Sequence, residues 1–365
     1  HRLYTNLSVV HAMAAAMPGT NAREVDEHIL GIPHVGDDST DRQPMSTAIR
    51  SALGVPGAAL RMAGAGRRIA DLDERVRRMS LPAGALRELD GNALLTVIDT
   101  SRELVLDAWA YSTTTNLVAS AAQALVRRLA PELDLAAMRG GTDGLTSATL
   151  LSGVRRLVEL TRARPGVEKL LREEQGEDLL DRIDAVDPGF AKAFRHLIAD
   201  AGHRGPGETE MANPMYSDRP EQLLDAVRKA LDVAPRPTGE APDPSGVARR
   251  AVGVLNAAVR RRERSKDVAV RSTHALRLAL REVGRRQVDA DVFADAGDVF
   301  YLVPEEVAAP ARFVGKIPAR RTERARLAAL QLPSMFTLRW EPLNSNASTP
   351  GPVDVLRGIG VSPGI

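Results

Sequence analysis

Residues 246–288 read GVARRAVGVLNAAVRRRERSKDVAVRSTHALRLALREVGRRQV and form the longest helical pattern in the chain. Apolar residues recur along this stretch at spacings of three and four, which is the period of an α-helix that buries one face. The stretch also carries most of the clustered arginines of the chain. The sequence therefore predicts one long, arginine-rich helix from Gly246 to about Val288.

The same spacing continues before this helix and predicts a mainly α-helical, multi-helix protein with few, short strands. The hydroxyl-rich run Ser112–Thr115 is expected to interrupt a helix, because such side chains compete for backbone hydrogen bonds. Asp298–Val303 is expected to be a short strand or a turn, and Pro304 to open a small helix after it. The other predicted helices cover Val9–Met17, Pro44–Leu53, Ala58–Met79, Ala83–Ala110, Leu117–Leu129, Leu150–Arg162, Val167–Glu174, Asp178–Ile183, Phe190–Ala201 and Pro220–Leu231.

Three segments depart from the helical pattern. Gly202–Pro220 mixes glycines, prolines and polar residues, so it is expected to be a loop. Val233–Ser245 holds four prolines among polar residues, which indicates an ordered excursion or a linker, and Leu343–Pro352 has a linker composition. We expect a helical domain over residues 1–345, with two helical subdomains split near 202–245 as the alternative, and a module boundary before residues 346–365.

Composition narrows the possible chemistry. The chain contains no cysteine among 365 residues, which excludes disulfides, thiolate metal sites and a cysteine nucleophile. A net charge of +2 and an aromatic content of 3% argue against nucleic-acid binding. Apolar runs are far shorter than the roughly 20 residues of a membrane span, and no secretory pattern is seen, so a cytoplasmic location is expected. No metal site is expected, because the loop around His28 and His34 reads as irregular.

Two cations on the long helix form a first candidate site. Arg262 and Lys266 stand four residues apart, so both project from one helix face, and this spacing suits an anion. The alternative is a solvated helix surface on which Glu263 and Asp267 offset the charge.

The loop GHRGPGE, Gly202–Glu208, forms a second candidate site. His203 supplies an imidazole that can transfer protons near neutral pH, and Arg204 supplies a guanidinium that can bind phosphate or carboxylate. The alternative is structural: Arg204 and Glu208 would fix the loop to neighbouring helices through a buried ion pair.

Four stretches share their order and spacing with a known group of proteins. They are RLYTNLS at Arg2–Ser8, the loop Gly202–Glu208, RERSK at Arg262–Lys266 continuing through Arg281-Glu282 to DVFYL at Asp298–Leu302, and LRG with SPG at Leu356–Gly358 and Ser362–Gly364. Together they resemble the region between the nucleotide-grasp and phosphohistidine modules of phosphoenolpyruvate-utilising enzymes, the group that includes phosphoenolpyruvate synthase and rifampin phosphotransferases.

This resemblance implies a helical middle domain over residues 1–345, similar to the rifampin-binding domain of rifampin phosphotransferases. Residues 346–365 would be a linker and the first strand of the swivelling phosphohistidine domain. In this family ATP phosphorylates a mobile histidine, which then passes the phosphoryl group to an acceptor. The Gly-Gly-x-x-Ser-His-Ala stretch that carries this histidine does not occur in this sequence, and none of the seven histidines can be assigned its role. We therefore expect ATP and Mg²⁺ to act in the full-length protein through flanking modules, with no cofactor bound by this chain.

The resemblance also implies a function. The chain is expected to hold a hydroxylated small molecule within a bacterial ATP-dependent phosphotransferase, in contact with flanking ATP-grasp and phosphohistidine domains. His203 would be the catalytic group that orients or deprotonates the acceptor hydroxyl, and Arg204, Arg262 and Lys266 would bind the substrate. Pyruvate is the least favoured acceptor. The alternative is a catalytically silent ligand-binding or scaffold domain.

An apolar acceptor pocket would draw on Met13, Met17, Leu104, Trp109 and Tyr111, although at helical spacing these are expected to be ordinary core.

Overall fold

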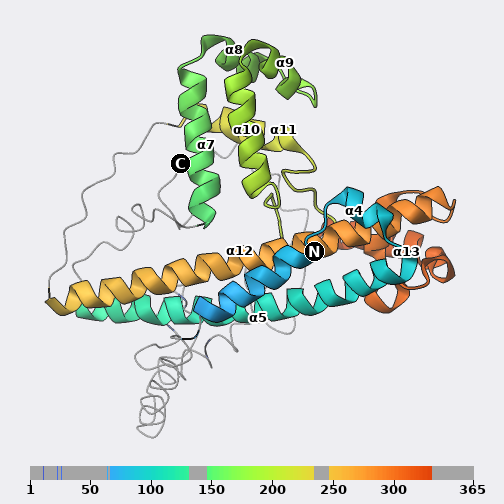
Figure 1. Cartoon of the computed structure of the whole chain (residues 1–365), viewed down its shortest axis with the longest axis horizontal. Coiled ribbons are helices and arrows are strands. Elements are labelled where there is room, and N and C mark those ends of the chain that lie inside the picture. The colour runs from blue at the N-terminus through green and yellow to red at the C-terminus, as the bar shows by residue number, and fades with distance from the viewer. Residues whose placement is uncertain are drawn as a thin grey trace, which may run out of the picture. The chain divides into compact units, whose positions relative to one another are not determined.

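The computed structural model describes His11, Arg23, Asp26, Gly64 and residues 66–130, 146–233 and 246–330. These residues are mainly α-helical, and no strand occurs among them (Figure 1). A helix covers residues 66–79, and the named elements are α4 (Ala83–Glu88), α5 (Gly91–Leu129), α7 (Thr146–Arg162), α8 (Pro165–Glu173), α9 (Leu179–Val186), α10 (Pro188–Ala201), α11 (Pro220–Leu231), α12 (Gly246–Asp289), the 3₁₀ helices η4 (Ala296–Tyr301), η5 (Pro304–Glu306), η6 (Pro310–Arg312) and η7 (Val314–Lys316), and α13 (Ile317–Ala328).

The longest predicted helix is confirmed, since α12 runs from Gly246 to Asp289. The predicted bounds of α11 are confirmed as well, and the stretch between α10 and α11 is built of turns, as expected of a loop. The Arg2–Ser8 stretch, the helix expected over Pro44–Leu53 and everything after residue 330 lie outside the described residues. The helix expected over Val9–Met17 also lies outside them, apart from His11, which is helical.

The predicted interruption at Ser112–Thr115 is wrong, because α5 continues through it. Thr113 and Thr114 each donate a hydroxyl hydrogen bond of 3.0 Å to the carbonyl oxygen four residues earlier. The hydroxyl of Thr115 lies 2.5 Å from the Ser265 hydroxyl of α12. These side chains are therefore satisfied without displacing the backbone hydrogen bonds of the helix.

A break that the sequence pattern did not predict separates α4 from α5. The expected single helix over Ala83–Ala110 ends at Glu88 and restarts at Gly91. The Asp90 side chain accepts a 2.8 Å hydrogen bond from the backbone N–H of Ala93, which satisfies one of the free donors at the start of α5.

The strand alternative for Asp298–Val303 is also wrong, because 3₁₀ helix η4 occupies most of this segment. The Asp295 side chain accepts from the backbone N–H of Gly297 at 2.7 Å, and the Asp298 side chain accepts from the backbone N–H of Asp295 at 3.3 Å. This reciprocal capping starts a helical turn. Pro304 opens the short helix η5, as predicted.

The chain divides into two compact units, to which α5 and α12 both contribute residues. In its described part, the first unit comprises Pro82–Thr96 and residues 277–330. In its described part, the second unit comprises His11, Arg23, Asp26, Gly64, residues 66–81 and the described residues between 97 and 276, so the whole loop from 202 to 219 belongs to it.

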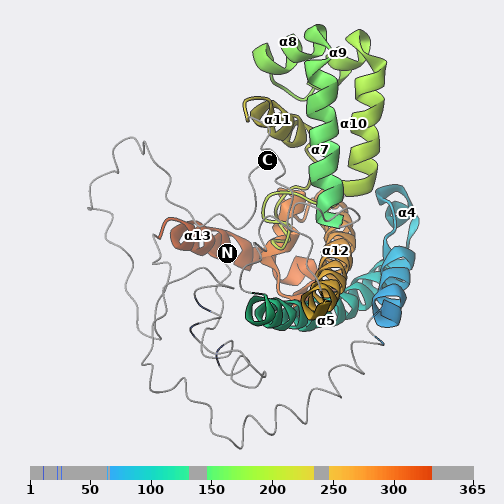
Figure 2. The ribbon, with the colours of Figure 1, turned by 90° about the vertical axis from the view of Figure 1, so that its left-hand side faces the viewer.

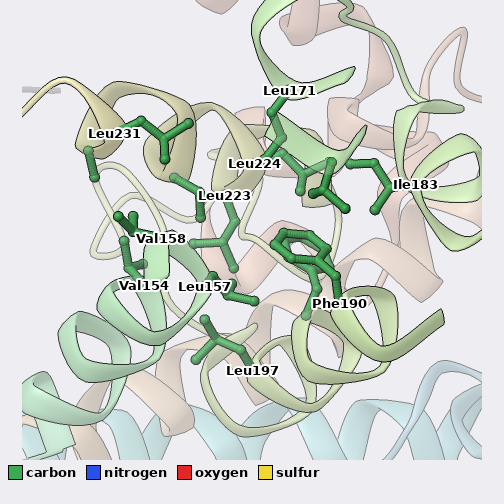
Figure 3. Close-up of a cluster of buried hydrophobic side chains, with 14 of the residues drawn as sticks. Val154, Leu157, Val158, Leu171, Ile183, Phe190, Leu197, Leu223, Leu224 and Leu231 are labelled. Atoms are coloured by element: carbon green, nitrogen blue, oxygen red, sulfur yellow. The ribbon is translucent and has the colours of Figure 1, made fainter. Parts of the chain in front are cut away.

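Helices α7 to α11 of the second unit enclose one apolar cluster (Figure 3). Ile183 and Phe190 are completely buried there, together with Val167 and Leu171 of α8. Leu157 of α7 is 2% exposed. This cluster fixes α10 and α11, the two helices between which the loop is held.

The long helices α5 and α12 lie side by side in both views (Figures 1 and 2). Val126 of α5 packs in one cluster with Leu255 and Ala258 of α12. The helix over residues 66–79 joins them through a further cluster that contains Ile69, Leu72, Val76, Ala108, Val268 and Ala269. Leu104 is buried, and Trp109 and Tyr111 pack against that cluster, as expected of core residues, whereas Met13 and Met17 lie outside the described residues.

Two glycines of α12 provide a matched test of this packing. A Cβ added to Gly284, within the first unit, would lie 2.0 Å from the carbonyl oxygen of Ala296, whereas a Cβ at Gly253 would meet no heavy atom within 4 Å. Gly284→Ala should therefore destabilise the protein by about 1–3 kcal/mol through overpacking. Gly253→Ala should stabilise it by about 0.5–1 kcal/mol, because alanine loses less backbone freedom in a helix. Urea unfolding of both variants measures the difference, and equal effects at the two positions would contradict this packing.

Candidate functional site

The loop between α10 and α11 is held in a defined shape by its own hydrogen bonds. The backbone N–H of Tyr216 donates to the carbonyl oxygen of Arg204, and that of Ser217 donates to Gly202, both at 2.9 Å. Gly207 has a positive φ of 64°, a conformation that favours glycine. The Asn213 amide donates to the Gly207 carbonyl oxygen at 3.2 Å. These contacts hold His203 and Arg204 in place.

His203 forms a pair with a carboxylate of α12. Its Nε2 lies 3.0 Å from Oδ1 of Asp267, and the two side chains are only 12% and 6% exposed. Burial opposes ionisation of Asp267, but His203 and Arg271 together hold the pKa of this carboxyl below its ordinary value. Asp267 is therefore an ionised partner for the imidazole at neutral pH.

A chain of ion pairs continues from Asp267 to the helix over residues 66–79. Nε of Arg271 donates to Oδ2 of Asp267 at 2.8 Å, and Nη2 of Arg271 donates to Oδ1 of Asp73 at 2.5 Å. Burial opposes the charge on Arg271, yet the two carboxylates raise its pKa above the ordinary value. Asp73 in turn lies 3.6 Å from Nη2 of Arg264. Both oxygens of Asp267 thus have partners from different elements.

Arg204 lies near the same Asp267 oxygen as His203. Its Nε and Nη2 donate to the two oxygens of Glu208 at 2.6 and 3.2 Å, and its Nη1 lies 3.8 Å from Oδ1 of Asp267. Nζ of Lys266 lies 3.4 Å from the Glu208 oxygen that also accepts from Nη2. The ion pair anticipated between Arg204 and Glu208 is therefore present within the loop, with both side chains partly buried, and Lys266 connects it to α12.

Arg262 has a different partner from Lys266. Its Nε and Nη2 donate to Oε1 of Glu263 at 3.0 and 2.6 Å. Its carbonyl oxygen accepts from the Ser265 hydroxyl at 2.9 Å. Through these ion pairs, the two cations contact separate carboxylates rather than one shared anion.

The structure brings three of the four predicted site residues into one cluster. His203, Arg204 and Lys266 are linked through Asp267 and Glu208, and we call these five residues the loop–helix cluster. The carboxylates of Asp267 and Glu208 lie between His203, Arg204 and Lys266, so these three side chains are held in place by charge-assisted hydrogen bonds and ion pairs.

Sequence reasoning missed three contributors to this region. Arg271 follows Asp267 by four residues on one helix face, a spacing that could have indicated the pair. Asp73 carries no such signal, because its partner is 198 residues away in sequence. Tyr216 is the third: burial raises its phenol pKa, as does the nearby Glu208 carboxylate, so it stays protonated at neutral pH.

Within the described part of the chain, no three His, Asp or Glu side chains are grouped so that they could hold a metal ion. The segment around His28 and His34 lies outside that part. Among the same residues, no helix combines the length and the apolar character that crossing a membrane requires.

The part of the chain that holds the loop–helix cluster matches a known protein family. The family described as the rifampicin phosphotransferase fourth domain matches residues 108–287, where rifampicin is another name for rifampin. Uncharacterized proteins of Mycobacterium tuberculosis and Mycobacterium bovis are 34% identical to the chain over 383 aligned residues, which cover 100% of it. The chain spans 44% of the length of these relatives. Residues 108–287, which include the whole loop–helix cluster, are therefore a domain of the rifampicin phosphotransferase fourth-domain type.

Proposed function

We propose that this chain is the acceptor-binding part of an ATP-dependent phosphotransferase, in which a mobile histidine elsewhere in the full-length protein delivers phosphate to a hydroxylated small molecule. The family match over residues 108–287 carries this proposal, because His203, Arg204, Arg262 and Lys266 all lie within it. ATP and Mg²⁺ are assigned to other modules of the full-length protein.

The chemistry proposed for His203 follows from its pairing with Asp267. A carboxylate beside an imidazole orients the ring and stabilises it when it takes up a proton. Phosphoryl transfer also needs cations close to the charge on the transferring group, and Arg204 and Lys266 are candidates for that role.

The proposed transfer balances as follows. The acceptor oxygen forms a bond to phosphorus while the phosphorus–nitrogen bond of the donor histidine breaks. The proton of the acceptor hydroxyl passes through His203 to the released donor imidazole. The net change is transfer of the phosphoryl group to the acceptor oxygen and of one proton to the imidazole of the donor histidine.

One observation favours the second candidate, a catalytically silent scaffold. Arg204, Arg262 and Lys266 each contact a carboxylate of the chain itself, as structural cations do. Under this alternative the full-length protein transfers no phosphate, and variants of the loop–helix cluster change only its stability, so transfer and folding have to be measured together.

A binding experiment tests the proposal on this chain alone. We expect calorimetry to show binding of rifampicin, a hydroxylated polyketide used as the probe, and none of pyruvate. We also expect no ATP hydrolysis, since the nucleotide is assigned to another module. ATP turnover by the chain alone would contradict the proposal. Binding of rifampicin by the chain, combined with a full-length protein that never transfers phosphate, would favour the scaffold.

A further inference from the structure

We propose that Asp267 is the positioning residue for His203: it holds the imidazole through Nε2 and leaves Nδ1 as the nitrogen that exchanges a proton with the acceptor hydroxyl. This inference rests on the proposed function, because it assigns a role to a residue that acts through His203. Asp267 itself is not assigned any contact with the substrate.

The position of Asp267 is fixed from several elements. Oδ1 faces His203 at 3.0 Å, while Oδ2 accepts from Arg271, which is tied at its other end to Asp73. A carboxylate held at both oxygens has little freedom to rotate, so it presents Oδ1 to the imidazole at a constant place. The ion-pair chain from Asp73 to His203 thus connects the helix over residues 66–79, α12 and the loop.

Burial makes this arrangement different from an ordinary surface pair. A second histidine–aspartate pair in the chain, His196 with Asp200 at 3.1 Å on α10, has side chains 78% and 50% exposed. Water competes with such a pair and both side chains can turn away from each other. The side chains of His203 and Asp267, at 12% and 6% exposed, are shielded from that competition.

A carboxylate on Nε2 has a definite chemical consequence for the imidazole. The ionised Asp267 accepts a hydrogen bond, so Nε2 of neutral His203 carries the proton and Nδ1 is left as the basic nitrogen. Loss of the carboxylate would leave the ring free to change its tautomer and its orientation. Both changes would slow proton transfer while leaving acceptor binding intact.

A double-mutant cycle of His203 and Asp267 in the full-length protein tests this assignment. The measured quantity is the single-turnover rate of transfer from the phosphohistidine to the acceptor. Asp267→Asn should slow transfer about 10- to 100-fold, the cost typical of losing the partner that orients a functional histidine, with the acceptor concentration at half-maximal rate unchanged. Asp267→Glu, which keeps the charge, should recover part of the rate. In a His203→Gln background, Asp267→Asn should have no further effect. The control Asp200→Asn removes the exposed carboxylate and should leave transfer unchanged.

The outcomes separate the inference from the proposed function. If His203→Gln leaves transfer intact, the role proposed for His203 is wrong and the inference falls with it. If His203→Gln abolishes transfer while Asp267→Asn does not slow it, only the inference is overturned. An equal slowing by Asp267→Asn in both backgrounds would show that Asp267 acts through the fold, and would also overturn it. Should Asp267→Asn unfold the protein, the cycle is run with Asp267→Glu, whose effect must likewise vanish without His203.

Discussion

Replacing His203 by glutamine in the full-length protein should lower the rate of phosphate transfer to the acceptor by about 10²- to 10⁴-fold, the contribution typical of a general acid or base. Glutamine keeps a polar side chain of similar length but cannot take up the proton. Formation of the phosphohistidine from ATP should continue, because this step is assigned to other modules. Rapid-quench measurement with labelled ATP follows both steps in one experiment.

His196 provides the matched control for this substitution. It belongs to the same chain and also pairs with an aspartate, but its side chain is 78% exposed on α10. His196→Gln should leave transfer within about twofold of the wild type, since substitutions of exposed side chains usually have small effects. Equal losses in the two variants, or no loss in His203→Gln, would contradict the role proposed for His203.

The second large effect concerns the apolar cluster that holds α10 and α11. Leu157→Ala should destabilise the protein by about 2–5 kcal/mol, because Leu157 is 2% exposed and its truncation leaves a cavity among packed side chains (Figure 3). Urea unfolding followed by circular dichroism measures the change. The loop between α10 and α11 should also become more accessible to proteases.

Leu151 supplies the control within the same helix. It is 39% exposed on α7, so Leu151→Ala removes the same atoms with little loss of packing. Its effect should stay below about 1 kcal/mol. A cost at Leu151 as large as that at Leu157 would contradict the described core.

Local patterns predicted the helices well wherever one rule dominated. The apolar spacing of residues 246–288 predicted α12. Pro220 predicted the start of α11, because proline is favoured in the first turn of a helix. The pattern failed where a side-chain contact, which apolar spacing does not describe, decides whether a helix continues or begins. Thr115 stays helical because it contacts Ser265, a residue 150 positions later. Asp90, two residues after the end of α4, caps the start of α5 with its carboxylate.

The candidate site was predictable only as far as its residues belong to local sequence motifs. The loop and the RERSK stretch are recognisable as motifs, so His203, Arg204, Arg262 and Lys266 could be named in advance. The partner that gives His203 its geometry could not, because Asp267 lies 64 residues away and the sequence shows it only as a charge beside Lys266. Long-range pairing brings Asp267 to His203 and Asp73 to Arg271, and spacing along one helix does not reveal these two contacts.

The most direct test of the central claim follows the labelled phosphate in a single turnover of the full-length protein. Labelled ATP should first place the label on a histidine outside this chain. Addition of a hydroxylated acceptor should then move the label to the small molecule, and His203→Gln should leave it on the protein. Label that reaches the acceptor equally fast without His203, or that leaves the protein only as inorganic phosphate, would contradict the account.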